Sequence, residues 1–199
     1  MKLQQKKKME KKNKKNPLKH PEQRVGVFID VQNLYYSAKN LFGKKVQFGN
    51  IVKEAVGDRK LIRAIAYVVR TESNEEQPFF EALYKLGIET REKDLQIFPG
   101  GMKKADWDVG LAVDAIRLSS SLDAIVLVSG DGDYLPLVEY LQKSTGKQVE
   151  VVAFSETSSS RLIEEADSFL DLSENKQKFL MVDRRMRAQY RKKKVSKKK

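Results

Sequence analysis

The chain of 199 residues carries a formal net charge of +12 and contains no cysteine and a single histidine, His20. This composition excludes disulfides, thiolate metal sites and cysteine nucleophiles, suits a reducing cytoplasm, and argues against a histidine base or a zinc site. No apolar run reaches the length of about 18 residues that a membrane-spanning helix needs, and the basic start lacks the apolar segment of a signal peptide. We therefore expect a cytoplasmic protein without a membrane partner.

Apolar periodicity predicts strands and helices that alternate along the chain. Strands are expected over 25–29, 61–69, 88–98, 123–128, 148–154 and 169–172. Helices are expected over 33–42, 51–56, 75–86, 106–119, 134–144 and 158–166. This alternation is typical of an α/β domain in which a central, mainly parallel sheet lies between two layers of helices.

Charge divides the chain into an acidic body and two basic arms. Residues 1–24 carry a net charge of +8 and residues 176–199 carry +11, which leaves −7 for residues 25–175. We predict a basic arm over 1–24, a folded domain over 25–172 and a basic helix or tail over 173–199. Basic runs of this kind favour nucleic-acid phosphates, although they can also serve only as solubilising tails.

The stretch AIVLVSGDGD, residues 124–133, contains the clearest functional signal. Its unbroken apolar block is typical of a strand that is buried on both faces of a parallel sheet. A tight loop follows, in which Gly130 and Gly132 provide an open backbone and Asp133 is the expected N-cap of the next helix. Ligands of open α/β sheets bind where a strand leads into a helix, so Asp131 and Asp133 are candidate ligands.

Two more carboxylates are placed for the same site. Asp30 ends the first predicted strand, and Asp108 lies on the helix face that we expect toward the sheet. That face is otherwise apolar: Leu111, Ala112, Ala115 and Ile116. A carboxylate there is costly unless something pairs with it. Simpler local explanations also exist, because Asp30 and Asp133 could cap helices and Asp106 could cap a helix or pair with Arg117 on the outer side.

Four aspartates are thus expected at one edge of the sheet: Asp30, Asp108, Asp131 and Asp133. Two unpaired carboxylates about 4 Å apart repel by roughly 4 kcal/mol at an effective dielectric constant of 20. Protonation, the nearby Lys103 and Lys104, or a bound cation would relieve this repulsion. The two lysines, which precede the helix of Asp108, are also candidate substrate-binding residues. A divalent cation fits best, since all-oxygen ligands suit Mg²⁺ or Mn²⁺.

Several polar and aromatic residues flank these acids. Asn33 is a candidate neutral ligand or substrate contact, and Ser129 is a candidate hydrogen-bond donor to a carboxylate or a phosphate. Both also fit ordinary positions in a first helical turn and a tight turn. Tyr35, Tyr36 and Trp107 could stack on bases, but aromatic residues at helical spacing more often pack.

Three segments, in this order, are similar to motifs of the NYN domain, the branch of PIN-like nucleases that includes the LabA-like proteins: FIDVQN at 28–33, KADWDVGLAVD at 104–114 and VSGDGDY at 128–134. The resemblance covers residues 25–172. It implies a PIN-like three-layer α/β/α sandwich with Mg²⁺- or Mn²⁺-dependent ribonuclease chemistry at an acidic pocket.

The resemblance also implies site residues, which carry over position by position. Metal ligation is implied for Asp30, Asp108, Asp131 and Asp133, with Asn33 as a helper beside Asp30. Asp106 is a second candidate beside Asp108. Asp114 matches the family pattern too, but it is expected on the other side of its helix in a structural role.

We therefore expect a metal-dependent ribonuclease, an endoribonuclease, that cleaves RNA at the aspartate cluster and holds it with the basic arms. The alternative is a catalytically inert PIN-like protein that binds RNA in a regulatory role. A phosphomonoesterase with an aspartyl nucleophile is less favoured, because Gln32 stands where such enzymes commonly have a second acid. The sequence leaves open the RNA target and whether the chain forms a homo-oligomer.

Overall fold

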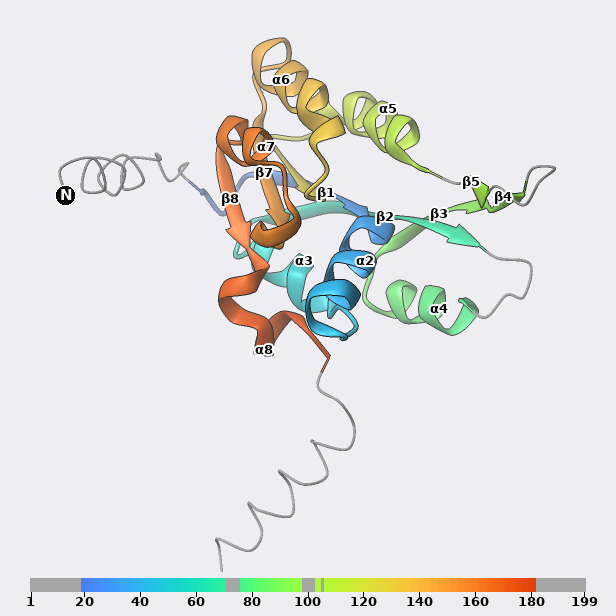
Figure 1. Cartoon of the computed structure of the whole chain (residues 1–199). Coiled ribbons are helices and arrows are strands. Elements are labelled where there is room, and N and C mark those ends of the chain that lie inside the picture. The colour runs from blue at the N-terminus through green and yellow to red at the C-terminus, as the bar shows by residue number, and fades with distance from the viewer. Residues whose placement is uncertain (1–18, 71–75, 98–102, 105, 182–199) are drawn as a thin grey trace, which may run out of the picture.

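A computed structural model describes residues 19–70, 76–97, 103–104 and 106–181 of the chain (Figure 1). Six parallel strands form the main sheet in the order β3-β2-β1-β6-β7-β8. Their bounds are β1 (Arg24–Asp30), β2 (Lys60–Arg70), β3 (Glu89–Asp94), β6 (Ala124–Val128), β7 (Gln148–Ala153) and β8 (Ser168–Asp171). A separate antiparallel pair joins β4 (Gln96–Ile97) and β5 (Lys103–Lys104).

Helices cover both faces of the sheet, so the predicted three-layer α/β/α architecture is confirmed (Figure 1). One face carries α2 (Val31–Phe42), α3 (Phe48–Val56), α4 (Gln77–Lys85) and α8 (Lys176–Phe179). The other carries α5 (Asp108–Ser119), α6 (Leu135–Lys143) and α7 (Ser160–Glu165). Short 3₁₀ turns lie at η2 (Gly132–Tyr134), η3 (Ser155–Thr157) and η4 (Leu172–Asn175). Within the described residues, no helix combines the length and the apolar character needed to cross a membrane.

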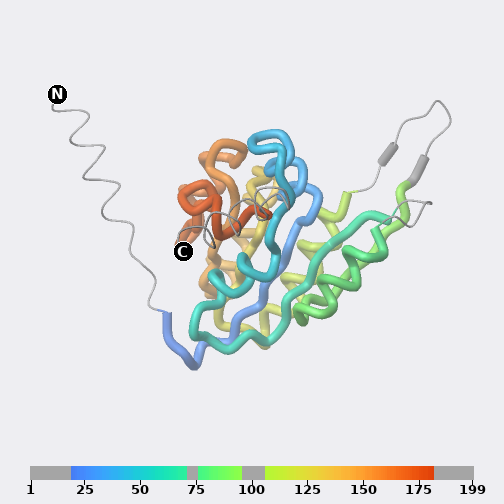
Figure 2. The backbone as a smooth tube through the Cα atoms, turned by 90° about the horizontal axis from the view of Figure 1, so that it is seen from below, coloured from blue at the N-terminus to red at the C-terminus, as the bar shows by residue number. Residues whose placement is uncertain are grey.

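Each face of the sheet has its own apolar core, because alternate residues of every strand point to opposite sides. Val27 and Ile29 of β1 lie in the core beneath α2 and α3, whereas Phe28 between them lies in the core beneath α5 and α6. All five residues of β6 are buried, as expected for a central strand covered on both faces. Figure 2 looks onto the layer that contains α2 and α3.

The two central strands, β1 and β6, mark the point where the chain reverses its direction across the sheet. From β1 the chain passes through α2 and α3 to β2 on one side, and from β6 it passes through α6 to β7 on the other. The helices that leave the two strands lie on opposite faces, and ligands of such sheets bind at the carboxyl ends of the strands where the direction reverses. This topology places the candidate site.

Element ends differ from the predicted ones in a few places. Helix α2 begins at Val31 because Asp30 itself is the N-cap, with Oδ1 accepting from the Asn33 amide at 3.0 Å. It ends at Gly43, whose φ of 60° closes the helix in the left-handed conformation. The predicted strand 88–98 divides into β3 and β4.

The C-terminal part of the fold extends past residue 172. The 3₁₀ turn η4 and the short helix α8 follow β8. Phe179 and Leu180 are buried in the core beneath α2 and α3. Residues 1–18 and 182–199, which include most of the two predicted basic arms, lie outside the described residues.

Candidate metal centre at the carboxyl edge of the sheet

Three carboxylates meet at the carboxyl ends of the central strands. Asp131 and Asp133 belong to the loop after β6, and Asp108 is the first residue of α5. One oxygen from each of these side chains lies within 4.8 Å of one oxygen from each of the others. We call Asp108, Asp131 and Asp133 the acidic trio.

The acidic trio concentrates three carboxylates in a site that is only partly buried. Asp108 and Asp131 are half-buried and Asp133 is exposed. None of the ion pairs formed among the described residues involves these three side chains. Like charges this close repel one another, and protons or a bound cation would reduce the repulsion.

Asp30 lies behind the acidic trio instead of within it. Its carboxylate is 9% exposed, with Oδ1 held by the Asn33 amide and Oδ2 within 3.3 Å of Ser129 Oγ and 3.4 Å of the Tyr134 hydroxyl. Three of the four ligands expected from the sequence therefore meet at one point. The fourth, Asp30, caps α2 and accepts hydrogen bonds from the side chains of Ser129 and Tyr134.

The Tyr134 hydroxyl lies between the carboxylate of Asp30, at the end of β1, and that of Asp108, at the start of α5. This hydroxyl donates to Asp108 Oδ1 at 2.9 Å, and the Tyr134 side chain is buried. Burial and the charges of Asp30 and Asp108 raise the pKa of this phenol, so it stays a neutral donor. Tyr134 was not among the site residues predicted from the sequence, yet it shares the helical spacing of the buried Leu137, Val138 and Leu141, and this spacing indicates that it points inward.

The loop after β6 is fixed by its own hydrogen bonds. Asp131 Oδ1 accepts from the Asp133 amide at 3.0 Å and caps η2, so the sequence-based expectation of Asp133 as the N-cap of α6 is wrong. The 3₁₀ turn η2 lies between Asp131 and α6, so the Asp131 carboxylate caps η2, and α6 has no side-chain cap. The Gly130 amide donates to Asn33 Oδ1 at 3.0 Å, which ties α2 to the loop.

Ser129 supports the loop from below. Its side chain is fully buried, lies 3.3 Å from Asp30 Oδ2, and accepts from the Asp131 amide at 3.2 Å. This burial does not favour the direct contact with substrate that the sequence suggested for Ser129. Its contacts instead connect Asp30 to the backbone of Asp131.

Gly130 is required for space and not for an unusual backbone angle. A Cβ atom at Gly130 would lie 2.3 Å from Ser158 Oγ and 3.0 Å from Ser158 Cα. The segment that precedes α7 therefore packs directly on the loop that carries Asp131, and the Ser159 amide donates to the Gly130 carbonyl at 2.9 Å.

Two acids of the site bind protons more tightly than usual. Burial, followed by the charges of Asp108 and Asp131, raises the pKa of Asp30 against the hydrogen bonds from Asn33 and Ser129. Burial also raises the pKa of Asp108, with further contributions from Asp131, Asp106 and Asp133. The hydrogen bond from Tyr134 opposes this shift. Ionising these acids together is therefore unfavourable until positive charge arrives.

The other acids of the sequence motif lie outside the acidic trio. Asp106 is exposed and precedes α5, and its carbonyl oxygen accepts from Lys93 Nζ at 2.9 Å. Asp114 accepts from the Tyr67 hydroxyl at 3.1 Å and from Arg117 at 2.8 Å. These contacts give Asp114 a structural environment on the far side of α5.

The remaining residues singled out from the sequence divide between the core and the surface. Trp107 packs against Tyr67 with ring centroids 5.5 Å apart and donates from Nε1 to the Val68 carbonyl at 2.8 Å, so it is a packing residue. Ile116, expected toward the sheet, is exposed. Tyr35 and Tyr36 are also exposed. The side chains of Lys103 and Lys104 lie outside the described part of the structure, although their backbone forms β5.

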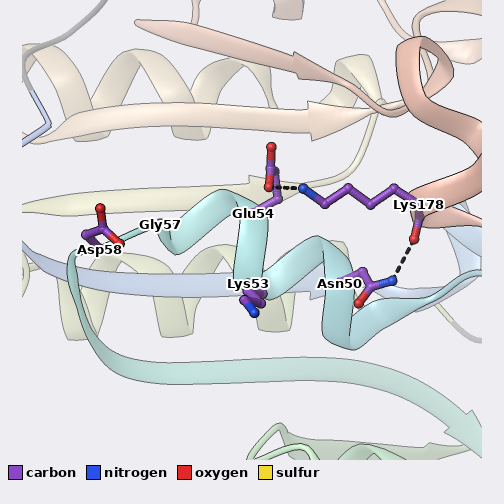
Figure 3. A pocket seen from close by; sticks show the side chains of 6 residues that line it. All are labelled: Asn50, Lys53, Glu54, Gly57, Asp58 and Lys178. Carbon is purple, nitrogen blue, oxygen red and sulfur yellow. Dashed lines mark hydrogen bonds and ion pairs between the residues drawn. The ribbon is translucent and has the colours of Figure 1, made fainter.

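A cavity of about 350 Å³ lies elsewhere, beside α3 and Lys178 (Figure 3). Lys178 Nζ pairs with Glu54, and Asn50 Nδ2 donates to the Lys178 carbonyl at 2.7 Å. At this cavity the charges of Lys178 and Glu54 neutralise each other, in contrast to the charges of the acidic trio.

Comparison with known proteins identifies the family. The model of the NYN domain matches residues 24–173. The chain belongs to the NYN domain family. The Low amplitude and bright protein LabA of Synechococcus elongatus is 24% identical over 160 residues, which cover 76% of this chain and 84% of that protein. A crystal structure of a protein of unknown function from Vibrio parahaemolyticus is 29% identical with a TM-score of 0.74, over 82% of this chain and 99% of that one.

The family and the geometry agree on the general character of the site. NYN domains are generally nuclease-like and usually use divalent cations, and this NYN domain has an acidic cluster. Carboxylate oxygens such as those of the acidic trio are the hard oxygen donors that Mg²⁺ and Mn²⁺ prefer. The residues present therefore fit a divalent cation.

Proposed function

We propose that this NYN domain is a metal-dependent endoribonuclease that hydrolyses RNA phosphodiesters at the acidic trio. The observation that carries the proposal is the convergence of Asp108, Asp131 and Asp133 within 4.8 Å, with no cationic partner among the residues that the structure describes. Such an arrangement is unfavourable for folding alone, and membership of a nuclease-like family supplies a use for it.

The chain's own residues have distinct tasks in this proposal. Asp108, Asp131 and Asp133 would hold Mg²⁺ or Mn²⁺, which supplies an acidified water and neutralises charge on the phosphate. Tyr134 and Ser129 hold the carboxylates of Asp108 and Asp30 in place. Asn33 uses its carbonyl oxygen to fix the loop, so its NH₂ group is the part that can donate to a phosphate oxygen.

The basic arms have the charge to retain RNA near an acidic site. We propose that the basic segments 1–24 and 176–199 bind phosphates, which offsets the repulsion between RNA and residues 25–175, whose net charge is −7. Binding of this kind is insensitive to sequence and weakens steeply as salt increases.

Cleavage of an unstructured RNA in Mn²⁺ or Mg²⁺ tests the proposal. The Asp131→Asn variant should lose about 100-fold or more of the cleavage rate, which is the scale for removing one charged group that stabilises the transition state. Asp58→Asn is the matched control, because Asp58 lines the cavity of Figure 3 away from the trio and should cleave as the wild type does.

The same assay separates the alternative functions. RNA that is bound but left intact by the wild type with every divalent cation would favour the inert RNA-binding protein. Equal cleavage by the wild type and Asp131→Asn would remove the site assignment. Comparing Asp106→Asn with Asp108→Asn decides which acid of the Asp-Trp-Asp motif is needed, and we expect only Asp108→Asn to lose activity.

A further inference from the structure

The exposed face of α2 carries an unusual pair of aromatic side chains. Val31, Leu34 and Ala38 are buried against the sheet, whereas Tyr35 and Tyr36 are 39% and 53% exposed. Their ring centroids lie 5.3 Å apart at an interplanar angle of 74°. Both rings are therefore only partly covered by the domain and keep exposed aromatic surface that a ligand can contact.

Charge around this helix differs from that of the rest of the body. The sequence of α2 contains no acidic residue, although the body between the arms is acidic overall. Lys39 lies one turn beyond Tyr35, with Nζ 5.6 Å from the centre of the Tyr35 ring. An aromatic pair next to a cation suits a ligand that has both flat rings and negative charge.

Helix α2 starts at the acidic site. Its first residue follows Asp30, and Asn33 in its first turn accepts from the Gly130 amide of the loop that carries Asp131. At about 1.5 Å per residue, Tyr35 lies only about 7 Å along the helix axis from Asp30. A chain that binds at the acidic trio can therefore reach the tyrosines within a short distance.

The far end of α2 lies beside the start of the C-terminal basic arm. Exposed Lys44 and Lys45 follow the helix, and the Lys45 carbonyl accepts from the Met181 amide at 2.8 Å. The sequence beyond Met181 contains ten Lys and Arg and one Asp. Lys176, which pairs with Glu156 at 3.8 Å, lies 4.3 Å from the ring of Phe42 at the same end. Positive charge thus continues from α2 toward the arm.

We propose that α2 is a binding track for single-stranded RNA, on which bases stack against Tyr35 and Tyr36 while phosphates pair with Lys39, Lys44 and Lys45. The inference rests on the proposed function for its choice of RNA as the ligand. Single strands fit because their bases can be unstacked, whereas the bases of a duplex are stacked on each other and cannot reach the rings. Stacking of this kind tolerates any base.

The test separates stacking from phosphate binding. The affinity of the full chain is measured in EDTA for a short unstructured RNA and for an abasic strand with the same backbone, because both strands present the same phosphates. The wild type should bind the base-bearing strand about 10- to 100-fold more tightly. Tyr35→Ala/Tyr36→Ala should bring this ratio close to 1 with its melting temperature retained, since both rings are exposed.

Two further variants complete the test. Tyr35→Phe/Tyr36→Phe keeps the π-faces and should keep the ratio, and Tyr84→Ala removes an exposed tyrosine of α4 and should leave the ratio unchanged. A wild-type ratio near 1, or a ratio that the Tyr35→Ala/Tyr36→Ala variant retains, would overturn the track. Because EDTA prevents metal-dependent cleavage, a protein that stacks bases in this assay yet never cleaves RNA would retain the track and refute only the nuclease.

Discussion

The charged residues at the amino ends of the strands and the acidic trio at the carboxyl ends of β1 and β6 differ in how their charges are compensated. At the amino ends of the strands, charged side chains are paired: Arg59 binds the buried Glu150 at 2.5 Å, and Arg24 binds Asp123 at 2.7 Å. At the carboxyl ends, Asp108, Asp131 and Asp133 face one another, and no Lys or Arg in the described part of the chain pairs with them. The charges at the amino ends are therefore compensated by pairs within the fold, whereas those of the acidic trio are not compensated by any ion pair among the described residues.

The pKa shifts follow this division. Hydrogen bonds from Arg24 lower the pKa of Asp123 to about 2. Burial opposes ionisation of Glu150, but the hydrogen bonds from Arg59 and Lys19 outweigh it and lower the pKa. Burial and neighbouring acids raise the pKa of Asp30 and Asp108. An acid that is paired within the fold indicates a structural role, whereas a half-buried acid among other acids indicates a binding role.

Breaking the paired end should give the largest change in stability. Arg59→Met leaves Glu150 buried beneath Lys19 without its main partner and also removes the hydrogen bonds from Arg59 to the carbonyls of Ala55 and Val56. We expect a loss of about 3–5 kcal/mol in the free energy of unfolding, measured by urea denaturation. Arg59→Met/Glu150→Met should recover much of this loss, and equal instability of the single and double variants would contradict the assignment.

Adding the missing charge at the other end should stabilise the protein. Mn²⁺ or Mg²⁺ at about 100 times its dissociation constant should contribute about 2.7 kcal/mol, measured as a rise in melting temperature. Because the pKa of Asp30 and Asp108 is raised, protons compete with the cation at low pH. Without the cation, stability should fall as pH rises from the unfolded pKa near 4 through these raised values. The cation-dependent rise should therefore be larger at pH 8 than at pH 5.

The Asp131→Asn variant is the control for this measurement. Its melting temperature should respond little to the cation at either pH, because one ligand of the trio has lost its charge. A full response in this variant would place the cation elsewhere in the chain.

Adding a side chain in the loop after β6 should lower the free energy of unfolding by less than breaking the Arg59–Glu150 ion pair does. Gly130→Ala forces a methyl group to within 2.3 Å of Ser158 Oγ and 3.0 Å of the Ser158 backbone, so we expect a loss of about 1–3 kcal/mol. At Gly132 a methyl group meets only the Ser159 side chain, at 3.0 Å, so Gly132→Ala should cost less. Equal unfolding free energies for the two variants would contradict the packing of this loop.

The smallest expected effect is a gain in stability, from a substitution within the acidic trio. Asp108→Asn keeps an acceptor for the Tyr134 hydroxyl but removes a charge that burial and its acidic neighbours disfavour. In EDTA near pH 7, the free energy of unfolding of the variant should be about 1 kcal/mol higher than that of the wild type. This corresponds to a rise of about 2–4 °C in melting temperature. A destabilised variant would show that Asp108 contributes to the fold as an ion.

The sequence predicted the elements well because their apolar patterns are strong and their ends carry clear signals. The buried block of β6 and the Gly43 ending of α2 are local features, and they appear as expected. The predicted cap at Asp133 was wrong because two aspartates two residues apart compete for one turn. Local sequence does not decide between them, and the structure assigns the cap to Asp131.

The candidate site was predictable as a set of acids but not as an arrangement. The convergence of Asp108 with Asp131 and Asp133 follows from parallel topology, which the alternation of elements had already indicated. The set-back position of Asp30 and the hydroxyl of Tyr134 between two carboxylates depend on side-chain packing across 104 residues of sequence separation. No period or spacing encodes such a contact.

Strand β3 has a consequence for how copies of this protein can meet. It forms one border of the sheet, and five of its six residues, ETREKD, are charged. Charged borders discourage a foreign strand from adding to a sheet. Pairing of copies through this border would have to place these side chains against a second charged ladder, so it is disfavoured there, whereas β8 (SFLD) at the other border has only one charged residue in four.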